Sequence, residues 1–158
     1  MRKLLQRTIA LVGAAVILSA LALYAQEAAQ PKPSMKRAAV LKAAEDLKWT
    51  DVPNVKGVQQ AVAWGDPQKG PHGAFDKFAA GTEVPLHSHT ANLRSVIISG
   101  TMVIAMEGQR AKELGPGSFA FLPSGAKHTT ACKAGADCLF YTQASGAFDV
   151  VPAEGANK

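Results

Sequence analysis

The segment Gly81–His89 reads GTEVPLHSH, and it places two histidines, His87 and His89, two residues apart. In an extended strand, residues i and i+2 project from the same face. Both imidazoles can therefore reach one metal ion.

A second segment, Gly117–His128, reads GSFAFLPSGAKH and supplies a third imidazole. His128 follows a turn that Pro123 and Gly125 predict. The sequence thus predicts that His87, His89 and His128 meet at one point.

The chain around these segments consists of short β-type runs separated by glycine and proline. Many short strands at regular spacing are typical of an antiparallel sandwich or a small barrel. The expected strands are Gln59–Trp64, Ala74–Phe78, Val84–His89, Arg94–Ile98, Thr101–Met106, Ser118–Leu122, His128–Cys132 and Cys138–Gln143.

The two segments resemble the paired motifs of the cupin superfamily. The first motif corresponds to Gly81, His87, His89 and Gly100, with Leu93 in place of a glutamate; the second corresponds to Gly117, Pro123, Gly125 and His128, with Cys132 in place of an asparagine. The resemblance implies an all-β fold, an antiparallel cupin β-barrel (double-stranded β-helix, or RmlC-like jelly roll). The chain looks most similar to small exported single-domain cupins related to the sensor-type cupin domain of anti-sigma factors.

The departure at Leu93 matters because a typical cupin ion has three histidines and one carboxylate as ligands. Leucine cannot ligate, so an ion held by three neutral imidazoles keeps its full double charge. The expected cofactor is a divalent metal ion, with zinc first and iron or copper as alternatives. Asn92 or Glu83 could replace the missing ligand, and an inward Arg94 could position a carboxylate, although strand parity places Arg94 on the other face.

The histidines can also be explained without a metal ion. His72, next to Pro71 in a turn, is interpreted as a hydrogen-bonded polar residue outside the site. The three site histidines could also belong to a barrel that kept its turns and lost its ion. Several apolar residues are candidates for pocket or core positions according to strand register; they are Leu86, Leu93, Ile97, Met102, Met106, Phe119, Phe121, Phe140 and Tyr141.

The N-terminus has the pattern of a secretory signal peptide. Arg2, Lys3 and Arg7 precede the uncharged run Thr8–Leu23, and cleavage is expected after Ala25 or Ala22. We therefore expect a periplasmic or secreted protein without membrane attachment once the leader is cleaved; an uncleaved anchor is the alternative.

Removing residues 1–25 takes away three positive charges and no negative ones, so the net charge falls from +5 to 5 − 3 = +2. No basic stripe with interleaved aromatic residues remains, which argues against nucleic acid as a partner.

After the leader, residues 26–48 are expected to form a linker and one short helix. The helix is predicted over Met35–Leu47, where Leu41, Ala44 and Leu47 form an apolar stripe. The barrel domain is expected over 49–152, and 153–158 form a C-terminal tail.

Cys132 and Cys138 flank a five-residue segment that is interpreted as a hairpin loop. Two residues at the base of a hairpin can lie at disulfide distance, and an exported chain meets oxidising conditions. We expect a structural disulfide, with a free thiol pair or a soft metal site as the alternatives.

The sequence supports three kinds of function. The first is a metal-dependent enzyme acting on a small-molecule substrate, with oxygenase, lyase, isomerase and hydrolase chemistry not distinguished. The second is a non-catalytic barrel that binds or senses a metal or a small ligand. The third is an interaction module in which an outer face of the barrel forms a homodimer.

Overall fold

The computed structural model of the protein describes residues 38–153, and all that follows concerns these residues. The expected signal peptide over 1–25, most of the linker and nearly all of the C-terminal tail lie outside them. No helix within the described range is long and apolar enough to cross a membrane. The elements described below belong to the compact unit Val40–Lys158.

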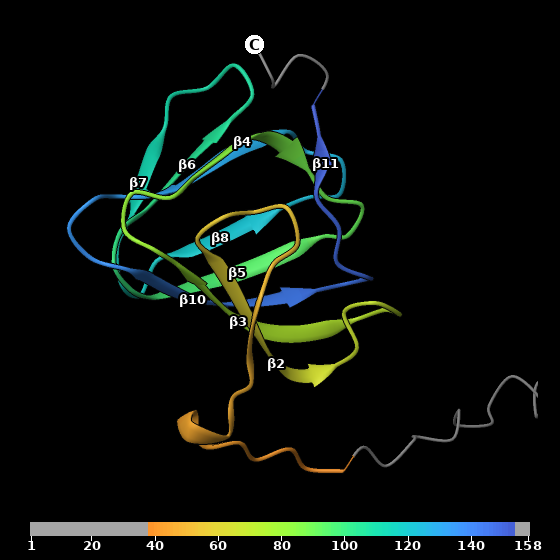
Figure 1. Cartoon of the computed structure of the whole chain (residues 1–158). Helices are drawn as coiled ribbons and strands as arrows, with labels where there is room; N and C mark the ends of the chain where they lie inside the picture. The colour runs from red at the N-terminus through yellow and green to blue at the C-terminus, as the bar shows by residue number, and fades with distance from the viewer. Residues whose placement is uncertain (1–37, 154–158) are drawn as a thin grey trace, which may run out of the picture. The chain divides into compact units, whose positions relative to one another are not determined.

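Two antiparallel sheets form the fold (Figure 1). The first sheet has the order β1-β2-β3-β10-β5-β8, with β1 (Trp49–Asp51), β2 (Val58–Gly65), β3 (His72–Phe78), β10 (Cys138–Ala144), β5 (Leu93–Ser99) and β8 (Phe119–Leu122). The second has the order β11-β4-β9-β6-β7, with β11 (Val151–Pro152), β4 (Glu83–Ser88), β9 (His128–Cys132), β6 (Met102–Met106) and β7 (Lys112–Leu114). This is the all-β jelly roll that the sequence predicts.

Alternating burial along the strands shows which faces form the interior. In β9 and β5, every second residue is buried, as expected for strands with one inward face. The main core cluster includes Val58, Phe78, Ile97, Met102 and Phe140, which come from both sheets. Core packing thus holds the two sheets face to face and orients the residues between them.

All eight expected strands are present, with bounds within two residues of those expected. Three further strands were not predicted, β1, β7 and β11, each only two or three residues long. These runs are too short to show a period of two. They exist because β2, β6 and β4 offer them free backbone partners at the sheet edges.

The predicted helix over Met35–Leu47 is wrong within the described residues, where only the 3-10 turn η1 (Ala44–Asp46) forms. Leu41, in the middle of the expected apolar stripe, is 93% exposed. A helix of this length is marginal in water unless its apolar face packs against something. Residues 35–37 lie outside the described range.

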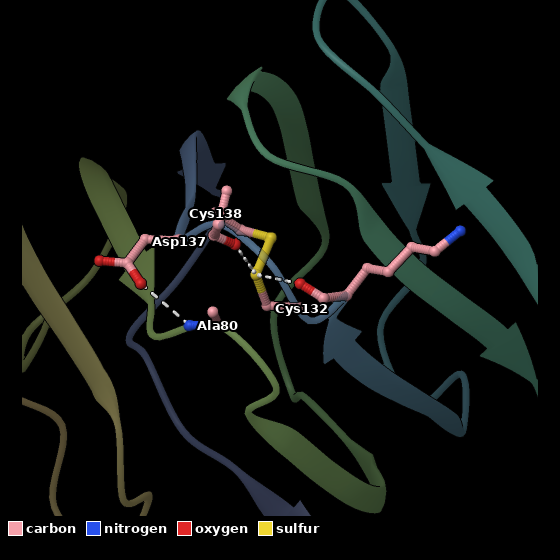
Figure 2. The surroundings of a disulfide bond; sticks show 6 residues. Ala80, Cys132, Asp137 and Cys138 are labelled. Atoms are coloured by element: carbon pink, nitrogen blue, oxygen red, sulfur yellow. Dashed lines mark hydrogen bonds between the residues drawn. A yellow bond between two sulfur atoms is a disulfide. The ribbon is translucent and has the colours of Figure 1, made fainter.

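The disulfide between Cys132 and Cys138 is present, but the expected hairpin is not. Cys132 ends β9 in one sheet and Cys138 begins β10 in the other, with their Cα atoms 5.8 Å apart. Figure 2 shows the bond and the connecting segment, whose Asp137 carboxylate accepts a hydrogen bond from the Ala80 backbone N–H at 3.0 Å. The disulfide therefore ties the two sheets together.

Gly100, the closing glycine of the first cupin motif, makes room for this disulfide. Its φ is +74°, and a Cβ there would lie 2.9 Å from the Cys138 sulfur and 2.6 Å from the Asp137 carbonyl oxygen. A larger residue would be strained in backbone conformation and would also clash. The motif glycine is thus needed for close packing against β10.

Candidate functional site

Three histidine side chains meet between the sheets. His87 in β4 lies opposite His128 in the β4–β9 ladder, and His89 follows directly after β4. Their ring centroids are 4.3 to 5.4 Å apart, and one ligating atom from each lies within 4.8 Å of the others. The predicted convergence of these rings is confirmed.

Backbone carbonyls fix the orientation of each ring. Nδ1 of His87 lies 2.7 Å from the Pro85 oxygen, and Nδ1 of His128 lies 2.9 Å from the Ala126 oxygen. Nδ1 of His89 contacts the carbonyl oxygen of Asp149. A carbonyl can only accept a hydrogen bond, so each Nδ1 must carry the proton. The neutral rings therefore keep the Nε2 lone pair free, as a metal ligand requires.

Burial favours the neutral form of the three imidazoles. Desolvation lowers the pKa of His87, His89 and His128, and the hydrogen bonds to the carbonyls oppose this in part. Each ring is at most 8% exposed. Near neutral pH the three rings are thus uncharged donors that can ligate without first losing a proton.

The segment between β10 and β11 completes the site on the side of His89. Besides its carbonyl contact with the ring, Asp149 accepts a hydrogen bond from the Thr90 N–H at 2.9 Å through its carboxylate. The Phe148 ring lies 5.8 Å from the His89 ring. Sequence reasoning missed this segment because its main contribution is a backbone carbonyl, which has no signature in the sequence.

The histidines open into a cavity of about 80 Å³ between the sheets. Most of its wall is apolar. The polar side chains that line it are His87, His89, His128, Asp76, Ser95, Thr130 and Thr142. Such a wall suits a small molecule with an apolar body and few polar groups.

Leu93 lines this cavity and is 7% exposed. The position where typical cupins carry a carboxylate therefore faces the interior with an apolar side chain. Within the described residues, the histidine cluster contains no carboxylate.

The suggested replacements for the missing ligand lie elsewhere. Asn92 uses its side-chain oxygen to accept a hydrogen bond from the Ser124 N–H at 3.0 Å. Glu83 is exposed, and Arg94 is exposed with its guanidinium 5.0 Å from the Phe121 ring centroid. Strand parity therefore predicted the outward position of Arg94 correctly.

The remaining histidine has the structural role expected for it. His72 is 2% exposed, and its Nδ1 lies 3.0 Å from the Gly70 oxygen and 3.1 Å from the Gly146 oxygen. It begins β3 and lies outside the three-histidine cluster.

Of the apolar residues considered for the pocket or the core, some face the cavity and others face outward, depending on their position in the strand. Leu93, Ile97, Met102 and Phe140 line the cavity. The inward positions considered for Phe119 and Phe121 are wrong, because these rings are 59% and 46% exposed. Leu122, directly after Phe121, is the buried residue of β8, and the alternation of the strand turns both phenylalanines outward.

A carboxylate that the sequence did not bring to attention lines the cavity. Asp76 in β3 is 7% exposed, and its Oδ1 accepts a hydrogen bond from Gln60 Nε2 at 2.9 Å. Desolvation raises its pKa to about 6, although hydrogen bonds from Gln60 and Thr142 oppose the rise. The signal available in the sequence was parity, since Asp76 lies between Ala74 and Phe78 on one face of an apolar strand.

Solved structures define the class of this fold. An RmlC-like cupin from Shewanella frigidimarina is similar with 20% identity and a TM-score of 0.55, over 77% of this chain and 97% of that one. The polyketide cyclase RemF from Streptomyces resistomycificus is similar with 21% identity and a TM-score of 0.60, over 78% and 88%. Rhodobacter sphaeroides SigE in complex with the anti-sigma ChrR gives 20% identity and a TM-score of 0.51, over 65% of this chain and 51% of that one. The fold is a cupin fold, as the motifs predicted.

A family model places the chain more narrowly. The model described as "Domain of unknown function (DUF4437)" matches residues 20–157, and the chain belongs to this cupin-like family. A search of curated proteins finds no significant match.

The buried carboxyl generates a prediction on stability. In the unfolded chain Asp76 loses its proton around the ordinary pKa of 3.8, whereas the folded protein keeps it up to about pH 6. The folded state therefore binds more protons between these values, and wild-type stability falls as pH rises through this window. Asp76→Asn removes that loss, so its stability relative to wild type should rise by roughly 2 kcal/mol between pH 4 and pH 7. Urea denaturation of both proteins across this range measures the difference.

The histidines contribute equally to the pH dependence of stability in wild type and in Asp76→Asn, so their contribution cancels in the difference between the two proteins. Asp51→Asn is the matched control, because Asp51 is exposed and accepts a similar hydrogen bond from Gln59 at 3.0 Å. Parallel stability curves for wild type and Asp76→Asn would show that the Asp76 carboxyl is not held in its neutral form.

Proposed function

We propose that this chain is an exported cupin in which His87, His89 and His128 hold one divalent metal ion, and that the site acts on a small molecule bound in the cavity. The observation that carries the proposal is the set of three buried imidazoles whose Nδ1 atoms all face backbone carbonyls. That arrangement leaves three Nε2 atoms as ligands, and neutral nitrogen donors suit zinc first, then iron or copper.

An ion bound there would act as a Lewis acid toward an oxygen of the bound molecule or toward water. The chain's own residues supply the rest. Carbonyls of Pro85, Ala126 and Asp149 hold the imidazole rings in position, while the apolar wall around Leu93 and Ile97 excludes water.

A non-catalytic barrel that binds a metal or a small ligand is the alternative, and the largely apolar cavity wall supports it. The same fold is found in a polyketide cyclase and in a complex with an anti-sigma protein, so the fold favours neither function. Asp76 favours the enzyme, because a carboxyl of raised pKa in the cavity can exchange a proton near neutral pH.

The metal site can be tested by composition and affinity. We expect the untagged wild-type protein to carry about one zinc per chain after incubation with zinc and dialysis, and the His87→Ala, His128→Ala double variant to carry almost none. Leu93→Glu should tighten zinc binding on the order of tenfold, because it restores a carboxylate at a cavity-lining position. Elemental analysis and competition with a zinc chelator measure the two effects.

Ile98→Glu is the matched control for the added charge, since Ile98 is 43% exposed on the same strand as Leu93. It should leave zinc affinity unchanged. Equal and negligible metal in wild type and in the double variant would support a barrel that has lost its ion.

Export follows from the leader and is supported by the inter-sheet disulfide, since such bonds persist in oxidising compartments. We expect the protein recovered from the periplasm of a Gram-negative host to begin at Leu23 or Gln26 and to contain Cys132 and Cys138 in oxidised form. Intact-mass spectrometry before and after reduction and alkylation tests both points. A full-length chain with two alkylatable thiols before reduction would contradict the proposal.

We propose that the outer face of the six-stranded sheet binds a second copy of this chain to form a homodimer. Val96, Ile98, Phe119 and Phe121 are each at least 43% exposed, and Val96 lies opposite Phe119 in the β5–β8 pair. Exposed apolar side chains that adjoin one another often mark an interface. Size-exclusion chromatography with light scattering should give a dimer for the mature chain and a monomer for Phe119→Ser, Phe121→Ser. A wild-type monomer would refute the dimer.

A further inference from the structure

A row of polar side chains crosses the inner face of the six-stranded sheet. Gln60 in β2 donates to Asp76 in β3, Asp76 bonds to Thr142 in β10, and the Thr142 hydroxyl lies 3.0 Å from the Ser95 hydroxyl in β5. Asp76, Ser95 and Thr142 are each at most 8% exposed, and all three line the cavity. Four adjacent strands thus contribute one continuous hydrogen-bonded row to an otherwise apolar wall.

The number of hydrogens in this row allows two arrangements. A hydroxyl has one hydrogen, so when Thr142 donates to an ionised Asp76, Ser95 must donate to Thr142. When Asp76 is protonated it can donate to Thr142, and the direction of both bonds reverses. A proton that arrives at Ser95 can therefore be received at Asp76 without movement of any heavy atom.

No positively charged side chain pairs with Asp76 among the described residues, so its carboxylate can still accept a proton. Within residues 38–153 none of the ion pairs involves Asp76, and neither Lys nor Arg lines the cavity. A permanent cation beside the carboxyl would lock it in the ionised form. Burial instead raises the pKa of Asp76 to about 6, so near neutral pH its carboxylate is ionised but readily protonated.

The geometry points to Asp76 as the proton acceptor of the cavity, reached through Ser95 and Thr142, for a small molecule that gives up a proton next to a metal-binding oxygen. This inference rests on the proposed metal site. In the step, the bond between the acidic hydrogen and the bound molecule breaks and its electron pair stays on that molecule. One proton is added at the Asp76 carboxylate, directly or along the two hydroxyls, and the total charge in the cavity does not change. Return of the proton at another atom would complete a lyase or isomerase reaction.

Acetohydroxamic acid is a suitable probe, because it binds zinc through oxygen and loses one proton when it does so. Isothermal titration of the zinc-loaded protein near pH 7, in two buffers of different ionisation enthalpy, gives the number of protons released to the buffer. Wild type should release almost none, since Asp76 takes up the proton as the ligand excludes water from the cavity. Asp76→Asn should release about one per molecule bound.

Two further variants isolate the carboxyl from the rest of the row. Thr142→Val leaves the carboxyl in place and removes a hydrogen bond that lowers the pKa of Asp76, so Asp76 should still take up the proton and the variant should release almost none, like wild type. Asp51→Asn, at the exposed carboxylate held by Gln59, should behave like wild type.

The outcomes distinguish this inference from the function on which it rests. Zinc-dependent binding with about one proton released by wild type and Asp76→Asn alike would overturn the role of Asp76 and leave the metal site standing. Absence of probe binding to zinc-loaded wild type would refute an open coordination position, and the proposed function with it.

Discussion

The pairing of β4 with β9 is the constraint on which the site depends. It sets His87 opposite His128, two residues from distant parts of the chain, and both face the interior of the barrel. Because side chains alternate along a strand, a slip of β4 by one residue in this ladder would turn His87 outward, while His128 would stay inward in the β9–β6 pair. The carbonyl contacts of the rings and the position of His89 would then lose their geometric basis. The core packing between the sheets therefore fixes the metal-binding geometry as well as the fold.

Much of this architecture could be predicted from the sequence, because its signals are local. Alternating apolar residues bounded by glycine and proline located eight strands, and the two histidine segments predicted the ring cluster. The short strands β1, β7 and β11 could not be found in this way, since two or three residues carry no period. The helix expected before the barrel failed for a related reason. Its apolar stripe was real, but Leu41 has nothing to pack against.

The chemistry of the cavity was less accessible from the sequence. Leu93 could be seen to replace a carboxylate, but only the fold shows that Asp76, on a different sheet from His87 and His128, lines the same cavity. One aspartate in a strand usually faces water, and its burial here follows from pairing with β2 and β10 on either side. The anionic group of the cavity thus lies on β3, two strands from Leu93 in the same sheet, instead of at the ligand position of typical cupins.

The disulfide limits how the barrel can open. Cys132 and His128 occupy the two ends of β9 on its inward face, and the sulfur bridge joins the sheets at the Cys132 end. Sheets fastened at one end can part only by pivoting about that end, so their separation grows toward the imidazoles. Any loosening of the barrel is therefore expected at the imidazole end of β9 and not at its disulfide end.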